Sequence, residues 1–186
     1  MTNKNLTVIK NADLIISMDD ARRVLNNYDI LISEGQIQKV EKNIRLEGFE
    51  NVIDAAGCLV TPGLVNTHHH LFQSLTKAVP GGQNALLFGW LKTLYPIWSR
   101  FGPEEIRIST ILGLSELALS GCTMSSDHLY LFPNGATLDD TIFAAHEVGL
   151  RFYPTRGSMS IGESQGGLPP DSLVEKERDI INDCIR

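Results

Sequence analysis

Several features that define other classes of protein are absent from this sequence of 186 residues. No apolar run approaches the roughly 18 residues of a membrane-spanning helix, and residues 1–20 lack the hydrophobic segment of a signal peptide. Basic residues are few, since 16 Lys and Arg against 22 Asp and Glu give a formal net charge of -6. A nucleic-acid binder needs a basic face to track phosphates. We therefore expect a cytoplasmic protein with no nucleic-acid or membrane partner.

Cysteine is also scarce, and two catalytic motifs are missing. Cys58, Cys122 and Cys184 are widely spaced and form no CxxC pair, so we expect three reduced, buried thiols and no disulfide framework. The sequence lacks the H-x-E and P-C-x-x-C segments that a cytidine-deaminase type of site requires. It also lacks a Gly-rich phosphate loop and a dinucleotide fingerprint. These absences exclude the corresponding enzyme classes.

Residues 1–60 are typical of closely spaced short strands with Gly, Asn and Asp turns between them. This pattern favours a small β-sandwich or sheet. The expected strands are 14–17, 28–32, 37–40, 51–54 and 58–60.

The pattern changes at Thr61-Pro62-Gly63, and residues 61–186 alternate strand-like and helix-like segments, as in β/α architectures. Pro103 opens a helix that stops near Gly121. The other expected elements are strands 64–67, 122–126 and 150–155, helices 138–148 and 172–186, and a loop 157–170. A (β/α)8 barrel of the TIM type needs eight such units and about 250 residues. We therefore predict an α/β protein, the N-terminal part of such a barrel with about three β/α units, preceded by the β-sandwich segment. The chain is expected to be a fragment.

Three consecutive histidines follow the first expected barrel strand. Side chains at i and i+2 of a strand project to the same side, so His68 and His70 should point together while His69 points away. Two converging imidazoles supply half of a zinc or iron site. They also lie at the C-terminal end of the strand, where barrel active sites are built. The pattern predicts a divalent metal held by His68 and His70.

A family resemblance rests on these residues. The run from Val60 to Leu71, VTPGLVNTHHHL, resembles the strand-one signature of the amidohydrolase superfamily. Segments 68–73, 88–98, 127–135 and 155–170 are similar to its 8-oxoguanine deaminase branch. Triazine hydrolases and guanine deaminase have similar strand-one segments, so they stay open as alternatives. In that superfamily a small sandwich flanks the barrel, which suits residues 1–60.

The resemblance implies a metal-dependent aminohydrolase that deaminates a purine-like heterocycle, most simply 8-oxoguanine. One metal, usually zinc with iron as an alternative, would be held by His68, His70 and a later His and Asp. Bound water with its pKa lowered towards 7 then supplies hydroxide, which attacks the carbon bearing the exocyclic amine and releases ammonia. The general acid/base is expected beyond Arg186 and is unassigned. The full-length form is expected to be a homo-oligomer.

Three residues are predicted to bind the substrate. By resemblance, the amide of Gln73 would bind the ring edge of a purine, with a loop-stabilising hydrogen bond as the alternative. Arg156 follows the third strand and could hold a ring carbonyl, or else form an ion pair. Trp90 belongs to an aromatic cluster, with Tyr95 and Trp98, in the long loop expected after strand one. It could cap a flat ring or merely pack in the loop.

Two further histidines are less informative. His128 ends the second expected strand and could line the pocket, whereas His146 lies within a helix and is expected to be a surface or packing residue. Two other hypotheses remain beside the truncated enzyme: a non-enzymatic remnant, and a small metal-binding protein of another kind. On the first hypothesis, the 186 residues alone should be inactive because the remaining ligands and the proton-transfer group are missing.

Overall fold

The chain divides into two compact units, Met1–Pro62 and Gly63–Arg186. The computed structural model describes residues 6–45 and 51–185 of them. The division lies two residues beyond the predicted boundary between residues 60 and 61, and each unit is described by itself below.

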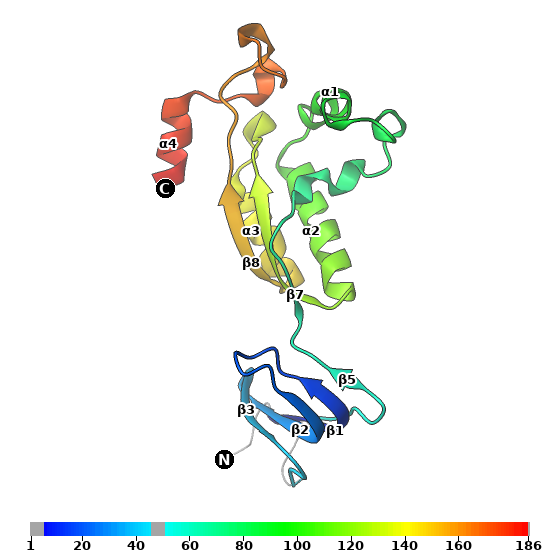
Figure 1. The fold of residues 1–186 in the computed structure, drawn as a ribbon. Coiled ribbons are helices and arrows are strands. Elements are labelled where there is room, and N and C mark those ends of the chain that lie inside the picture. Colours follow the sequence, from blue (N-terminus) through cyan, green and yellow to red (C-terminus); the bar gives the residue numbers. More distant parts are fainter. Residues whose placement is uncertain (1–5, 46–50, 186) are drawn as a thin grey trace. The chain divides into compact units, whose positions relative to one another are not determined.

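The first unit is a single mixed sheet (Figure 1). Its order is β3-β2-β1-β4, and β5 also pairs with β1. The central strand β1 is antiparallel to β2 and parallel to β4 and β5. A second layer, as in a sandwich, is not seen in the part of this unit that the structure describes. The strands are β1 (Leu6–Ile16), β2 (Val24–Ser33), β3 (Gln36–Glu41), β4 (Asn51–Asp54) and β5 (Leu59–Val60).

Strand β1 begins eight residues earlier than predicted from the sequence. Its pairing with β2 shifts register between Ile9 and Ala12, and Asn11 has a positive φ of 60°. The polar residues Lys10 and Asn11 at this bulge interrupt the apolar pattern, which concealed the first half of the strand.

A buried ion pair between Lys10 and Asp29 stabilises the centre of this sheet. Asp29 is only 3% exposed, and its Oδ2 accepts from Lys10 Nζ at 2.5 Å. The carboxylate also accepts backbone N–H bonds from Asn11 (2.9 Å) and Ile44 (2.8 Å). Burial alone would raise the pKa of Asp29, but these hydrogen bonds outweigh it and hold the pKa below its ordinary value.

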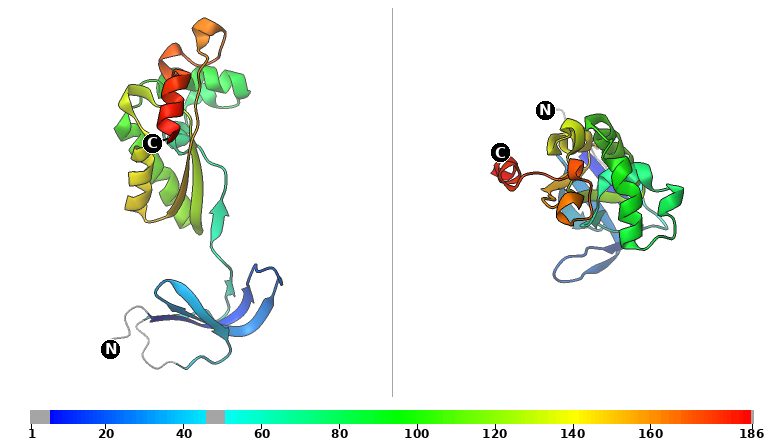
Figure 2. Two further views of the ribbon diagram at one scale, coloured as in Figure 1. Left: turned by 90° about the vertical axis from the view of Figure 1, so that its left-hand side faces the viewer. Right: turned by 90° about the horizontal axis from the view of Figure 1, so that it is seen from above.

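The second unit contains a parallel sheet of order β6-β7-β8. Its strands are β6 (Leu64–Asn66), β7 (Cys122–Leu129) and β8 (Arg151–Arg156). Helices α2 (Pro103–Leu119) and α3 (Leu138–Val148) pack beside each other on the strands, as Figures 1 and 2 show. The alternation of strands and helices confirms the predicted mixed α/β class, while a closed barrel remains a prediction.

The ends of α2 and α3 agree with the sequence signals. Pro103 is the first residue of α2, and Glu105 accepts the backbone N–H of Gly102 at 2.7 Å. Helix α3 ends at Gly149, whose φ of 77° is the left-handed conformation that favours glycine. The predicted helix 172–186 is wrong at its start. A 3-10 turn over Asp171–Leu173 is followed by extended backbone at Val174, and α4 spans Glu177–Ile185.

The expected long loop after strand one contains a helix instead. Helix α1 spans Leu87–Trp98 and buries Leu94, Tyr95 and Trp98. The spacing of three and four residues places them on one face, and Trp98 is the centre of their packing. The Trp98 ring lies 5.0 Å from that of Phe72 and its Nε1 donates to Thr76 Oγ1 at 3.1 Å. Pro96 lies inside α1, although proline is disfavoured in the interior of a helix.

The cysteines are free, as expected, but only Cys122 is buried. Cys58 and Cys184 are exposed, so the prediction of three buried thiols is wrong for these two.

Candidate metal centre

The three histidines, His68 to His70, lie just beyond the end of β6 and still contact β7; we call them the histidine segment. The N–H of His128 donates to the carbonyl of His69 at 2.9 Å, past the last residue of β6. The histidine segment therefore remains attached to β7, although its residues are not assigned to a strand.

The rings of His68 and His70 lie together, with centroids 5.3 Å apart. His70 Nδ1 lies 2.8 Å from the carbonyl oxygen of His128. Because a carbonyl can only accept, Nδ1 must carry a proton, and in the neutral imidazole Nε2 keeps its lone pair. This is the arrangement that orients a metal-bound histidine, so the imidazoles of His68 and His70 would fit one half of a zinc site.

His69 lines the same two hollows as His68 and His70. Its Nδ1 is buried and has no hydrogen-bond partner among the described residues. Its pKa is lowered, first by burial and then by the charges of Lys77 and His70. That His69 points away from His68 and His70 stays a prediction, as does metal binding by His68 and His70. No group of three or more His, Cys, Asp or Glu side chains suited to a metal occurs within residues 6–45 and 51–185.

Asp127 of β7, which sequence reasoning missed, contacts the residue that follows the three histidines. Asp127 is 2% exposed, and its Oδ1 accepts the N–H of Leu71 at 2.8 Å. Burial raises the pKa of Asp127 to about 6, against the lowering effect of backbone hydrogen bonds from Leu71 and His128. Ser125, Asp127 and Leu129 occupy alternate positions of β7 and are all buried. Their spacing of two residues is the sequence signal that could have indicated an inward-facing carboxylate.

His128 lines a hollow of about 190 Å³ together with Asp127 and the histidine segment, which agrees with the pocket-lining alternative. Its pKa is lowered by burial and then by the nearby His70 and His68. Gly157 is required beside it, because a Cβ at Gly157 would lie 2.3 Å from His128 Nε2. His146 is exposed on α3, as expected.

Gln73 lies in a 3-10 helix, Leu71–Thr76, directly after the histidines, and its contact with a substrate remains a prediction. It lines a second hollow, of about 280 Å³, with His68 and His70. Its Nε2 donates to the Tyr130 hydroxyl at 3.4 Å. Tyr130 was also missed; burial and the nearby Tyr95 raise its pKa to about 12, so it remains a neutral hydroxyl at physiological pH.

Arg156 is held by protein groups in this structure. Its guanidinium pairs with Glu175 at 2.5 Å and with Asp183 at 2.9 Å, donates to the carbonyl of Gly157, and lies over the ring of Phe132. The side chain is 7% exposed. These contacts match the ion-pair alternative, and a substrate contact would require Arg156 to exchange one of them.

Trp90 is a residue of α1 and packs against the core cluster that contains Trp98. Its ring lies 5.3 Å from that of Trp98, and a Cβ at Gly82 would lie 3.3 Å from its Cδ1. It is not among the described residues that line the two hollows at the histidines. The structure therefore shows a packing contact for Trp90, and its contact with a substrate remains a prediction.

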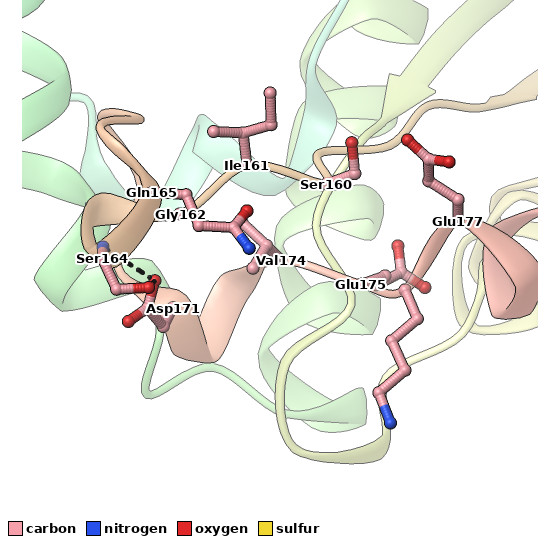
Figure 3. A pocket seen from close by; sticks show the side chains of 10 residues that line it. Ser160, Ile161, Gly162, Ser164, Gln165, Asp171, Val174, Glu175 and Glu177 are labelled. Atoms are coloured by element: carbon pink, nitrogen blue, oxygen red, sulfur yellow. Dashed lines mark hydrogen bonds between the residues drawn. The ribbon is translucent and has the colours of Figure 1, made fainter.

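A larger hollow, of about 680 Å³, lies between the loop after β8 and the start of α4 (Figure 3). Ser164 donates to Asp171 across one side, and Glu175 and Glu177 line the other. Glu175 is already paired with Arg156, and no histidine lines this hollow. The side chains that line this hollow therefore differ in type from those at the candidate metal centre.

Comparisons with known proteins identify the class. The model of the amidohydrolase family matches residues 59–184, so the chain belongs to this family. The chain is 50% identical to 8-oxoguanine deaminase of Pseudomonas aeruginosa over 135 residues, which are 72% of this chain and 30% of that protein. It is 38% identical to an isoxanthopterin deaminase from an unknown prokaryotic organism, over 83% of this chain and 33% of that protein.

Solved structures agree with this assignment. Triazine hydrolase from Arthrobacter aurescens superposes with a TM-score of 0.88 at 33% identity, covering 98% of this chain and 42% of that chain. Atrazine chlorohydrolase from the same species, complexed with zinc, gives a TM-score of 0.84 at 30% identity, with 96% and 42% covered. The chain thus spans about a third of the length of its curated relatives. None of the described helices is long and apolar enough to cross a membrane.

Proposed function

We propose that this chain supplies the first metal-binding segment of a hydrolytic deaminase that acts on an aminated purine-like heterocycle, 8-oxoguanine above all. The convergence of His68 and His70, with the proton of His70 held on Nδ1, is the observation that carries the proposal. The 50% identity to 8-oxoguanine deaminase supports the substrate.

Each residue has a defined task in this proposal. His68 and His70 would hold the divalent metal, zinc in the first instance. When bound, the metal supplies activation of water near neutral pH. The Gln73 amide can both donate and accept, which suits the edge of a purine ring, and the Tyr130 hydroxyl orients that amide. The general acid/base is not assigned to any residue of the chain.

Ammonia release by the natural gene product that contains this sequence tests the substrate. The comparison set is 8-oxoguanine, guanine, isoxanthopterin and aminated triazines. We expect the highest kcat/KM for 8-oxoguanine. A clear preference for triazines would favour the second candidate, a triazine aminohydrolase. That candidate is supported by the 32% identity to hydroxydechloroatrazine ethylaminohydrolase of Pseudomonas sp. over 92% of this chain. Guanine deaminase activity is the third possible outcome, and no turnover of any of these compounds would favour the non-enzymatic alternative.

A further inference from the structure

Two consecutive residues of β7, Asp127 and His128, form hydrogen bonds with three consecutive residues after β6, namely His69, His70 and Leu71. The N–H of His128 donates to the His69 carbonyl at 2.9 Å. The imidazole of His70 donates to the His128 carbonyl at 2.8 Å. The N–H of Leu71 donates to Asp127 Oδ1, also at 2.8 Å. We call these three hydrogen bonds the β7 clamp.

Only one bond of the β7 clamp depends on a side chain of β7, that of Asp127. The main chain of His128 provides the other two, and any residue at position 128 except proline could provide both. The N–H of Leu71 instead requires an acceptor from outside its own turn. Leu71 begins a 3-10 helix, η1 (Leu71–Thr76), whose N-cap residue His70 makes no capping hydrogen bond through its side chain. The first N–H groups of a helix have no partner within it.

In the intact protein this contact is shielded from solvent on both sides. Asp127 is 2% exposed and Leu71 is 0% exposed. Leu71 also packs with Leu114 and Ala145 in a core cluster, which fixes the backbone directly after His70. Without the carboxylate a buried N–H would lose its bond, and such groups are rarely left unpaired in proteins.

We infer that Asp127 is a positioning residue: by accepting the Leu71 N–H it sets the backbone at His70 so that Nε2 of His70 faces the metal. The inference rests on the proposed function, since it requires His70 to be a metal ligand. A competing role is open to the second oxygen, Oδ2, which is buried and has no partner among the described residues. Asp127 lines the same hollow as His68, so a direct contact of the carboxylate with metal or substrate is the alternative to be tested.

The test compares two variants of the natural gene product that contains this sequence. Asp127→Asn keeps an acceptor for the Leu71 N–H and removes the charge, whereas Asp127→Ala removes the acceptor. The Zn²⁺ dissociation constant is measured by competition with a chelator, and the Co²⁺-substituted protein is followed by its visible absorption. We expect Asn to bind Zn²⁺ within about threefold of wild type, and Ala to bind roughly 10–100-fold more weakly, as for lost outer-shell partners of metal ligands. The Co²⁺ spectrum should change for Ala only.

A matched control separates positioning from general loss of stability. Ile106→Ala removes a fully buried side chain of α2 that lies outside the β7 clamp. It should lower the melting temperature and leave the Zn²⁺ constant within about threefold of wild type, because large-to-small core changes cost mainly packing energy.

The outcomes are distinct. Loss of Zn²⁺ affinity by Asn equal to that by Ala would show that the charge itself is needed and would overturn the inference, as would wild-type affinity in the Ala variant. If the Ala variant does not fold, the Asn variant decides alone: unchanged affinity and spectrum support positioning, and a tenfold loss overturns it. If the wild-type protein binds Zn²⁺ no better than its His70→Ala variant, the proposed function fails instead.

Discussion

Alanine substitution of the three histidines separately is the most direct test of the metal centre. His68 and His70 converge, with ring centroids 5.3 Å apart, whereas the Nδ1 of His69 is buried and has no hydrogen-bond partner among the residues that the structure describes. His68→Ala and His70→Ala should therefore each remove one metal ligand. His69→Ala should remove none.

The magnitude follows from the number of ligands. Apparent zinc-binding free energies of about 10–16 kcal/mol are shared among four ligands in a tetrahedral site, or about 3 kcal/mol for each. At about 1.4 kcal/mol for each factor of ten, the loss of one ligand weakens zinc binding by roughly 100-fold. For His70 the hydrogen bond to the His128 carbonyl is lost as well. His69→Ala should change affinity by about threefold at most, since the predicted alternation makes His69 no ligand of the metal.

Metal content after dialysis against a graded series of chelator concentrations is the assay, with far-UV circular dichroism to confirm that each variant folds. The expected order of retained zinc is wild type, then His69→Ala, with His68→Ala and His70→Ala far below. Loss of zinc by His69→Ala as complete as that by His70→Ala would refute the reasoning from alternating side chains.

Three further predictions concern stability. Trp98→Ala should lower the free energy of unfolding by about 3–5 kcal/mol in urea titrations, because it empties the centre of the α1 core; a loss below 1 kcal/mol would contradict this packing. Asp29 has a lowered pKa, so its stabilising effect is complete above the ordinary value near 3.8 and is lost as the pH falls through the folded pKa. Asp29→Asn should cost about 3–5 kcal/mol at pH 7, where Lys10 is left unpaired, and this difference from wild type should shrink on acidification in melting experiments. Arg156→Leu should release the segment around Glu175 to limited proteolysis with little change in KM; a large rise in KM with no change in proteolysis would restore the substrate-binding role.

Local signals predicted much of the fold. Helix α3 was predicted with the bounds that the structure shows, because Gly149 supplies a left-handed C-terminal residue and the helix interior has regular apolar spacing. The start of α2 at Pro103 and the pairing of His68 with His70 likewise depend on residues close together in sequence. Helix α1 was missed because Pro96 obscured its apolar spacing, and tertiary packing of Trp98 stabilises it.

Contacts between distant residues could not be predicted in the same way. Asp127 meets Leu71 across 56 positions, and Tyr130 meets Gln73 across 57. The ion pair of Arg156 with Asp183 spans 27. Each depends on which strands and loops become neighbours, and a single sequence does not specify the register of those neighbours. The sequence shows the type of each of these residues, but it does not show which distant residue each one contacts.

The hydrogen bond from the His70 imidazole to a main-chain carbonyl has a consequence for sequence change at position 128. The carbonyl is present whichever amino acid occupies that position, so the tautomer of His70 does not depend on the side chain there. That side chain, at the same time, forms part of the wall of the adjacent hollow. Substitutions at 128 can therefore reshape the space offered to a ligand while the proton on His70 stays where metal binding needs it. In this part of the molecule, one residue orients a histidine through its backbone and shapes the adjacent hollow through its side chain.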